Sequence, residues 1–186
     1  AWGRESCTIA DIHAYRPSKH SLSQSQILLR NYTADEARLP MREMVESLVL
    51  ELLQIKAVTK CIHVHIGYAA EDVKSTGGSR TLAHYTDSFQ ELCPAVLALF
   101  DKYKRPHELI RRIAVSFEDL VNKAAVPTEM DLFSNALTDT AEQEEHIQKT
   151  MLNIKGRFGK NAILRASSLQ EEGTMQFRNT LVGGHN

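Results

Sequence analysis

The sequence has little cysteine, no excess of either charge and no long apolar run, and each shortage excludes a class of protein. Its three cysteines, Cys7, Cys61 and Cys93, are odd in number and widely spaced, so they fit neither a disulfide framework nor a CxxC pair. This pattern predicts a reducing, cytoplasmic setting. The longest apolar runs, such as residues 95–100, are far shorter than the ~18–20 residues that cross a bilayer, so we expect no membrane partner.

The charge balance gives no general signal for binding a polyanion. The 22 Lys and Arg residues against 23 Asp and Glu residues give a net charge of −1, so any nucleic-acid surface has to be local. A hydrophobic fraction of 42% and a length of 186 residues suit one globular domain with an appendage. Because the chain begins at Ala1 without an initiator methionine, we expect it to be a piece of a longer protein.

The first part of the chain predicts a linker, a strand and a helix. Residues 1–23 are serine-rich and predict the linker, and residues 24–32 predict a strand. Thr33 and Glu36 have the spacing of a capping box, at which a helix begins. Pro40 fits a first turn better than a helix interior, so the alternative is a continuous helix that begins at Pro40.

An amphipathic pattern supports this helix. Arg42, Glu43, Glu46 and Glu51 lie mostly off its apolar stripe, on the side that is polar in an amphipathic helix. The stripe recurs every three or four positions: Met41, Met44, Val45, Leu48, Leu52 and Ile55.

Period-two patterns then predict three more strands and a second helix between them. Residues 60–68 alternate apolar and polar, Gly77 and Gly78 predict a hairpin turn, and residues 80–85 predict the returning strand. A second capping box at Ser88 predicts a helix that continues to Tyr103. The last strand is expected over residues 112–121.

The predicted order of elements is therefore βαββαβ, which makes an α+β domain. Such a chain forms a four-stranded sheet with two helices on one face and leaves the other face open. We assign this domain to residues 24–125. Residues 126–186 form a C-terminal tail, with a helix capped by Thr140 and ended by Gly156 and then a polar, turn-rich end.

The sequence predicts neither a metal site nor catalytic residues. His63 and His65 share one face of a strand and His84 follows across the hairpin, but no fourth ligand or carboxylate has a useful spacing, so we expect exposed histidines. No catalytic motif is found, so this fragment is expected to have no activity of its own.

The open face of the predicted sheet is a candidate nucleic-acid surface. Strand alternation places Thr81, Arg112 and Ser116 opposite the apolar residues, while Lys60 and Arg80 are expected near strand ends. Small, hydroxyl-bearing and basic side chains can approach phosphates closely. The alternative is a sheet face that only contacts water.

Several segments resemble the little-finger domain of Y-family translesion DNA polymerases, whose fold is also βαββαβ. The similar segments are residues 110–117 (IRRIAVSF), residues 78–82 (GSRTL) and the lead-in Ser21-Leu22-Ser23. Residues 159–168 (GKNAILRASS) and Gly183-Gly184-His185 resemble the end of the bacterial UmuC-like branch in particular.

The resemblance implies the DNA-binding part of an error-prone polymerase of DNA repair and the SOS response. This part would hold primer–template DNA, and the parent would be a DNA-directed DNA polymerase, a transferase with a magnesium-dependent palm that this fragment lacks. No cofactor is therefore expected here, and other SOS-response proteins are further expected partners. The residues assigned to DNA binding are Ser21, Ser23, Lys60, Arg80, Thr81, Arg112 and Ser116.

A short motif in the tail resembles the peptide with which bacterial polymerases bind the sliding clamp. It consists of Glu129, Met130, Asp131, Leu132 and Phe133. Leu132 and Phe133 would fill an apolar pocket of the clamp, although Glu129 replaces the usual leading Gln and has no amide to donate. The alternative is that the Leu-Phe pair packs back on its own domain.

A function of another class also fits the predicted fold. A ferredoxin-like regulatory or dimerisation domain that binds a small molecule would have the same α+β architecture. Salt-sensitive binding to duplex DNA distinguishes the polymerase fragment from such a domain.

Overall fold

Four long strands form one antiparallel sheet. In this computed structural model, which describes residues 7–14, 21–126 and 135–181, the strands are β1 (Leu22–Tyr32), β2 (Ala57–Tyr68), β3 (Thr76–Thr86) and β4 (Ile110–Glu118). Their order across the sheet is β1-β4-β2-β3. The short β5 (Val121–Asn122) pairs with the start of β2 and leads into the single turn η1 (Lys123–Ala125).

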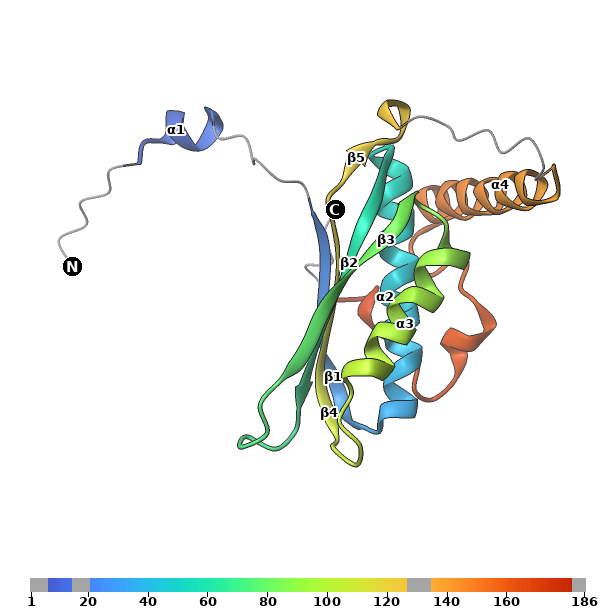
Figure 1. Ribbon diagram of the computed structural model, residues 1–186. Coiled ribbons are helices and arrows are strands. Elements are labelled where there is room, and N and C mark those ends of the chain that lie inside the picture. Colours follow the sequence, from blue (N-terminus) through green and yellow to red (C-terminus); the bar gives the residue numbers. More distant parts are fainter. Residues whose placement is uncertain (1–6, 15–20, 127–134, 182–186) are drawn as a thin grey trace.

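Helices cover one face of this sheet only. Helices α2 (Ala34–Gln54) and α3 (Phe89–Tyr103) lie side by side on it, and α4 (Asn135–Phe158) lies on the same side of the molecule (Figure 1). None of the helices described between residues 21 and 181 packs on the opposite face. The predicted α+β class and βαββαβ order are confirmed. The core between helices and sheet includes Leu48, Leu52, Ile62, Val64, Val96, Phe100, Val115 and Phe117.

Helix α2 begins at its predicted cap. The Thr33 hydroxyl accepts a hydrogen bond from the Glu36 amide at 3.3 Å, and the Glu36 carboxylate accepts one from the Thr33 amide at 2.7 Å. The helix then runs through Pro40 to Gln54, so the alternative start at Pro40 is wrong. The reciprocal cap satisfies amides of the first turn, whereas Pro40 removes only one donor later in the helix.

The second capping box forms only in part. The Ser88 hydroxyl accepts a hydrogen bond from the Glu91 amide at 3.3 Å, as predicted. The Ser88 amide, however, donates to the Thr86 hydroxyl at 3.1 Å, and the Glu91 carboxylate pairs with His84 at 2.8 Å. The cap position is therefore confirmed, but its second hydrogen bond has a different acceptor.

The prediction of a hairpin turn at Gly77 and Gly78 is wrong. Both glycines lie inside β3, paired with residues of β2, and the connection between the two strands spans residues 69–75. A Cβ on Gly77 would lie 2.2 Å from the Val64 carbonyl oxygen, and one on Gly78 would lie 2.4 Å from the Tyr103 ring. These glycines therefore allow close packing and do not form the turn.

The outer parts of the chain also differ from prediction. Helix α4 begins before Thr140 and continues through Gly156, since one glycine in a helix costs only about 1 kcal/mol. A short helix, α1 (Ile9–Ala14), lies in the predicted linker, and η2 (Ala166–Leu169) and α5 (Met175–Arg178) lie in the polar end. In the described ranges, no helix combines the length and apolar character that a membrane span needs.

The C-terminal segment packs against α2 on the side that is polar in the sequence pattern. Glu43 and Glu46 lie off the apolar stripe, yet only 2% and 4% of their surfaces are exposed. The Glu46 carboxylate accepts a hydrogen bond from Arg165 Nε at 2.6 Å, and Glu43 accepts hydrogen bonds at the start of α5. The second face of α2 is therefore buried by residues more than a hundred positions later in the chain.

Candidate nucleic-acid interface

Strand register defines the sheet face that no described helix covers. Ser116 of β4 pairs with Ser23 of β1 and with His63 of β2, and His63 pairs with Ser79 of β3. Paired residues of antiparallel strands point to the same side, so these four side chains form one row across the sheet. We call this surface the open face; it comprises Ser23, Ser25, Ile27, Cys61, His63, His65, Gly67, Gly77, Ser79, Thr81, Arg112, Ala114, Ser116 and Glu118.

Arg112 lies at one end of the open face. A β-bulge at Arg111 separates the Ile110–Tyr68 pair from the Arg112–Gly67 pair, and bulges of this kind re-aim side chains. A Cβ on Gly67 would lie 3.1 Å from the Arg112 Cβ, so the absence of a side chain at Gly67 leaves room beside Arg112. Arg112 is exposed and takes part in none of the ion pairs between described residues. Its guanidinium group is therefore available to a phosphate.

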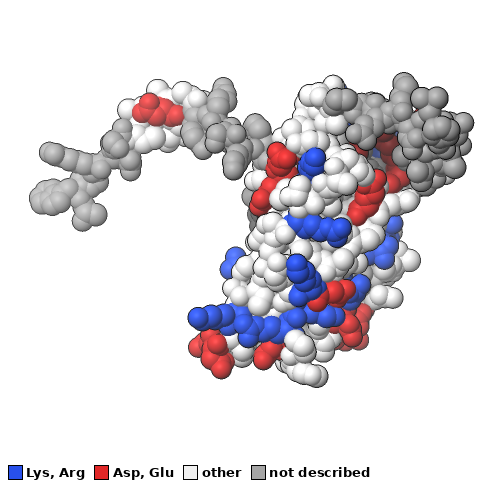
Figure 2. All heavy atoms as spheres, in the orientation of Figure 1, with Lys and Arg blue, Asp and Glu red and all other residues white. Residues whose placement is uncertain are grey.

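Further basic residues lie at the same end of the sheet. The Arg105 amide donates a hydrogen bond to the Tyr68 hydroxyl at 2.9 Å, which fixes the segment after α3 beside the end of β2. Lys102 lies on the last turn of α3, and Figure 2 shows several basic side chains at this end of the molecule, with acidic side chains beside them. We call Lys102, Arg105 and Arg112 the basic end. The sequence pattern indicated only that a helix ends near Tyr103, because the neighbourhood of Arg112 depends on the fold.

Most of the predicted DNA-binding residues lie together. Ser21 directly precedes β1, so it lies at the edge of the open face. The predicted residues on the face itself are Ser23, Thr81, Arg112 and Ser116. Ser25 and Ser79 were not predicted, although the same alternation that selected Ser23 and Thr81 places them on this face.

Lys60 and Arg80 lie elsewhere. The Lys60 ammonium group is 5.4 Å from the centroid of the Tyr85 ring, at the end of β2 that is distant from Arg112. Arg80 pairs with Ile62, whose side chain is in the core, so Arg80 points to the helix side of the sheet. It also lies in the middle of β3, so its expected place near a strand end is wrong.

Two histidines occupy the middle of the open face. Burial lowers the pKa of His65, and the positive charge of Arg112 and the neighbouring His63 lower it further. His65 is therefore neutral near neutral pH and offers a hydrogen bond to a ligand in place of a charge. His84, the third histidine of the sequence pattern, binds Glu91 at 2.8 Å.

The described residues contain no group of three or more His, Cys, Asp or Glu side chains that could hold a metal ion. The absence of a metal site stays a prediction for the whole chain.

The end of the open face away from Arg112 is acidic. Glu118 pairs with Cys61, which pairs with Thr81 on its other side. Burial raises the pKa of the Cys61 thiol, and the negative charge of Glu118 raises it further. On the open face itself, the negative charge is therefore at Glu118 and the positive charge at Arg112, so this face favours an anionic backbone at the Arg112 end.

These features define a class of protein: an α+β domain that presents an open, polar and locally basic sheet face. Residues 19–132 match the family described as the impB/mucB/samB family C-terminal domain, and the chain belongs to this family. The predicted resemblance to the little-finger domain of Y-family DNA polymerases is thereby confirmed.

Curated relatives extend well beyond this chain. A protein of Bacillus subtilis (strain 168) named UvrX is 30% identical over 172 residues, which cover 89% of this chain and 38% of that protein. DNA polymerase IV of Bacillus velezensis is 30% identical over 125 residues, which cover 67% of this chain and 29% of that protein. The chain thus spans 29–38% of the length of these relatives.

Solved polymerase structures align with this chain over part of its length. The insertion ternary complex of Dbh DNA polymerase aligns with a TM-score of 0.45 and 17% identity, over 60% of this chain and 33% of that chain. The complex of beta-clamp processivity factor and little finger domain of PolIV aligns with a TM-score of 0.42 and 12% identity, over 53% of this chain and 86% of that chain.

Proposed function

We propose that this chain is the part of an error-prone translesion DNA polymerase that holds primer–template DNA by its sugar–phosphate backbone. Membership of the polymerase-associated family supports the class of function. The observation that carries the proposal is the position of Arg112, exposed and outside the described ion pairs, at the end of a sheet face made of small polar residues.

The open face suits contact with a backbone better than the reading of bases. Ser23 and Ser116 offer hydroxyl groups to phosphate oxygens, while Ala114 and Gly67 allow the duplex to approach closely. Arg112 and Arg105 add positive charge at one end, where phosphates would release counterions. None of these groups forms a pocket for a base, so binding would not depend on sequence.

The chemistry of nucleotide addition would belong to the rest of a longer polymerase. Such a polymerase would need magnesium ions held by a cluster of carboxylates. The residues described in this chain do not fit that requirement, because they contain no acidic cluster of the necessary size. We therefore propose binding and positioning, without catalysis or a cofactor, for this chain itself.

Fluorescence anisotropy with two labelled duplexes of unrelated sequence and equal length tests this function. The full chain is expected to bind both weakly and with equal affinity at low salt, and to lose affinity as salt is added. Absence of binding together with a tight homodimer would instead support the ferredoxin-like regulatory or dimerisation domain.

We also propose that residues 129–133 bind the sliding clamp. The motif, which lies outside the described residues, places Leu132 and Phe133 together after Glu129, and burial of two such side chains is worth roughly 1.5–3 kcal/mol each before the peptide is ordered. Other SOS-response proteins are expected partners without an assigned surface.

Surface plasmon resonance on an immobilised clamp tests this motif. The Leu132→Ala/Phe133→Ala variant is expected to lose clamp binding while its free energy of unfolding stays within about 0.5 kcal/mol of the wild type. Glu129→Gln is expected to bind more tightly, because the amide restores a donor. A double variant that unfolds, with a wild type that ignores the clamp, would show that the pair packs on its own domain.

A further inference from the structure

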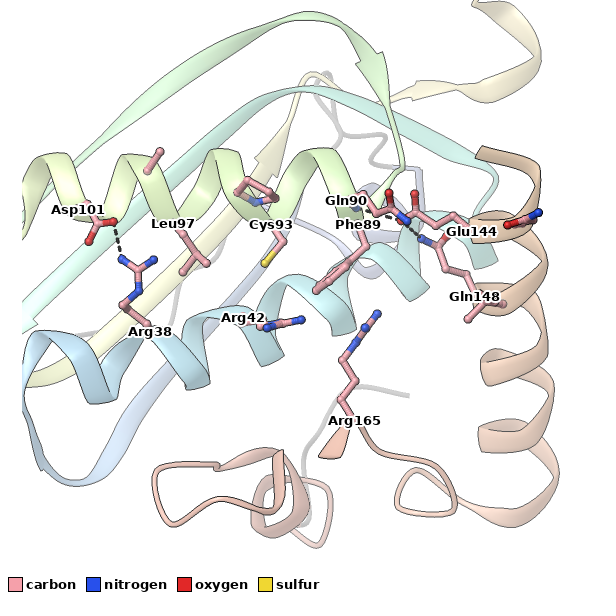
Figure 3. A pocket seen from close by; sticks show the side chains of 14 residues that line it. Arg38, Arg42, Phe89, Gln90, Cys93, Leu97, Asp101, Glu144, Gln148 and Arg165 are labelled. Atoms are coloured by element: carbon pink, nitrogen blue, oxygen red, sulfur yellow. Dashed lines mark hydrogen bonds and ion pairs between the residues drawn. The ribbon is translucent and has the colours of Figure 1, made fainter. Parts of the chain in front are cut away.

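A groove runs along α3 on the helix side of the molecule, away from the open face. It has a volume of about 730 Å³ and is enclosed by α2, α3, α4 and Arg165 of the C-terminal segment (Figure 3). The α3 residues that line it recur every three or four positions from Phe89 to Asp101. At 1.5 Å per residue this stripe is about 18 Å long, which suits an elongated occupant better than a compact ligand.

One wall of the groove is apolar and accessible. Pro94, Leu97 and Ala98 line its middle on α3, and Ile147 of α4 lines the end where Glu144 contacts Gln90, with 57% of its surface exposed. The small side chains of Pro94 and Ala98 let another backbone approach α3 closely. An exposed large apolar residue beside such a wall is typical of a surface that receives a partner.

The other wall carries positive charge, and Arg42 is its uncommitted member. Arg38 is hydrogen-bonded to Asp101, and Arg165 donates to Glu46 at 2.6 Å. Arg42 is exposed and takes part in none of the hydrogen bonds or ion pairs between described side chains. Its guanidinium carbon lies 5.7 Å from the centroid of the Phe89 ring.

A buried thiol in the floor of the groove lies within reach of the same charges. Burial raises the pKa of the Cys93 thiol, the positive charges of Arg42, Arg165 and Arg38 act in the opposite direction, and the negative charge of Glu46 raises it again. Charges of both signs therefore act on the floor of the groove, and the positive ones come from the wall that contains Arg42.

We propose that this groove binds an acidic amphipathic helix of a partner protein. Its apolar side chains would pack on Leu97 and Ile147, and one of its carboxylates would pair with Arg42. Such a helix matches the length of the groove. Its apolar side chains complement the apolar wall, and its carboxylate complements the positively charged wall. Duplex DNA fits less well, because its continuous row of phosphates would pass Asp101 and Glu144 at the two ends of the groove, whereas the helix needs a single carboxylate beside Arg42, between those ends (Figure 3).

Selection from a phage-displayed library of random 16-residue peptides on the full chain tests this proposal. Enriched peptides are expected to combine Asp or Glu with large apolar residues at helical spacing. In fluorescence anisotropy, Arg42→Glu and Ile147→Ser should each weaken a selected peptide by about tenfold or more. Arg157→Glu is the matched control on an exposed arginine of the last turn of α4 and should bind normally.

The two test variants come from different helices and alter exposed side chains, and far-UV circular dichroism with thermal melting verifies that each is folded. Exchange of Glu for Gln in the selected peptide should weaken binding to the wild type but not to Arg42→Glu. The proposal is overturned if no acidic peptide is enriched, if both variants bind as well as the wild type, or if a DNA duplex displaces the peptide.

Discussion

The Glu43 carboxylate of α2 accepts hydrogen bonds from Thr174 at the start of α5, although the two residues are 131 positions apart in the sequence. Its Oε2 atom accepts hydrogen bonds from the Thr174 amide at 2.9 Å, the Thr174 hydroxyl at 3.0 Å and the Met175 amide at 2.9 Å. A negative charge at a helix start satisfies amides that have no partner within the helix. This buried side chain therefore helps to attach the C-terminal segment to the domain, together with the Glu46–Arg165 hydrogen bond.

Loss of this acceptor should destabilise the fold. Glu43→Ala leaves the amides of Thr174 and Met175 buried without a partner, so we expect the free energy of unfolding to fall by about 2–4 kcal/mol. Glu43→Gln keeps a carbonyl acceptor and should lose less. Urea unfolding measures both, and Glu71→Ala on the exposed β2–β3 connection is the control. A Glu43→Ala variant as stable as this control would contradict the finding.

Two Gly→Ala substitutions should change the stability of the fold in opposite directions. A Cβ on Gly173 would lie 2.5 Å from the Ser168 carbonyl oxygen, so Gly173→Ala has to displace the C-terminal segment and should cost about 1–3 kcal/mol. Gly156 lies in α4 with no atom within 4 Å of the new Cβ, so Gly156→Ala should stabilise by about 0.5–1 kcal/mol. Thermal melts of the pair, compared with the wild type, reveal both signs. A lower melting temperature for both variants would show that α4 does not tolerate the added methyl group.

Acid should weaken the start of α2. The hydrogen bond from Arg30, with a second from the Thr33 amide, lowers the pKa of Glu36 from 4.5 to about 2. The unfolded chain therefore takes up this proton first, so the stabilisation is present above about pH 5 and is lost as the pH falls toward 2. Glu36→Gln should show a flatter dependence of unfolding free energy on pH in this window. Identical pH dependences would mean that ionisation of the Glu36 carboxylate does not contribute to stability.

Local sequence patterns predicted the elements whose signals come from neighbouring residues. Thr33 and Glu36 identify the start of α2 because both partners of the cap lie within one helical turn. Alternation over residues 60–68 identifies β2 because successive side chains of a strand point to opposite faces of the sheet. The position of Arg112 and Ser116 on the open face follows from the same alternation.

Features that depend on distant contacts were not predictable in this way. Gly77 and Gly78 have the composition of a turn, and only the approach of β2 and of Tyr103 explains why glycine is needed inside β3. Glu43 lies off the apolar stripe of α2, and its burial depends on Thr174, which no local pattern connects to it. The basic end likewise requires the Tyr68–Arg105 contact, which forms only when α3 packs on the sheet.

Arg80 is the informative comparison for the DNA-binding surface. Its assignment to DNA binding came from sequence alone, and the register with Ile62 turns it toward the helices. If the open face holds the duplex, Arg80→Gln should change DNA affinity much less than Arg112→Gln. Equal losses in competition binding would mean that the duplex also reaches around the β3 edge of the sheet.

The salt dependence of DNA binding tests the central claim most directly. For contact with three or four phosphates, the logarithm of the association constant should fall against the logarithm of salt concentration with a slope of roughly −3 to −4, measured by anisotropy with a labelled duplex. Arg112→Gln should reduce that slope by about 1, while Arg157→Gln on the helix side should leave it unchanged. Equal slopes for the wild type and Arg112→Gln would contradict the assignment of the open face as the DNA-binding surface.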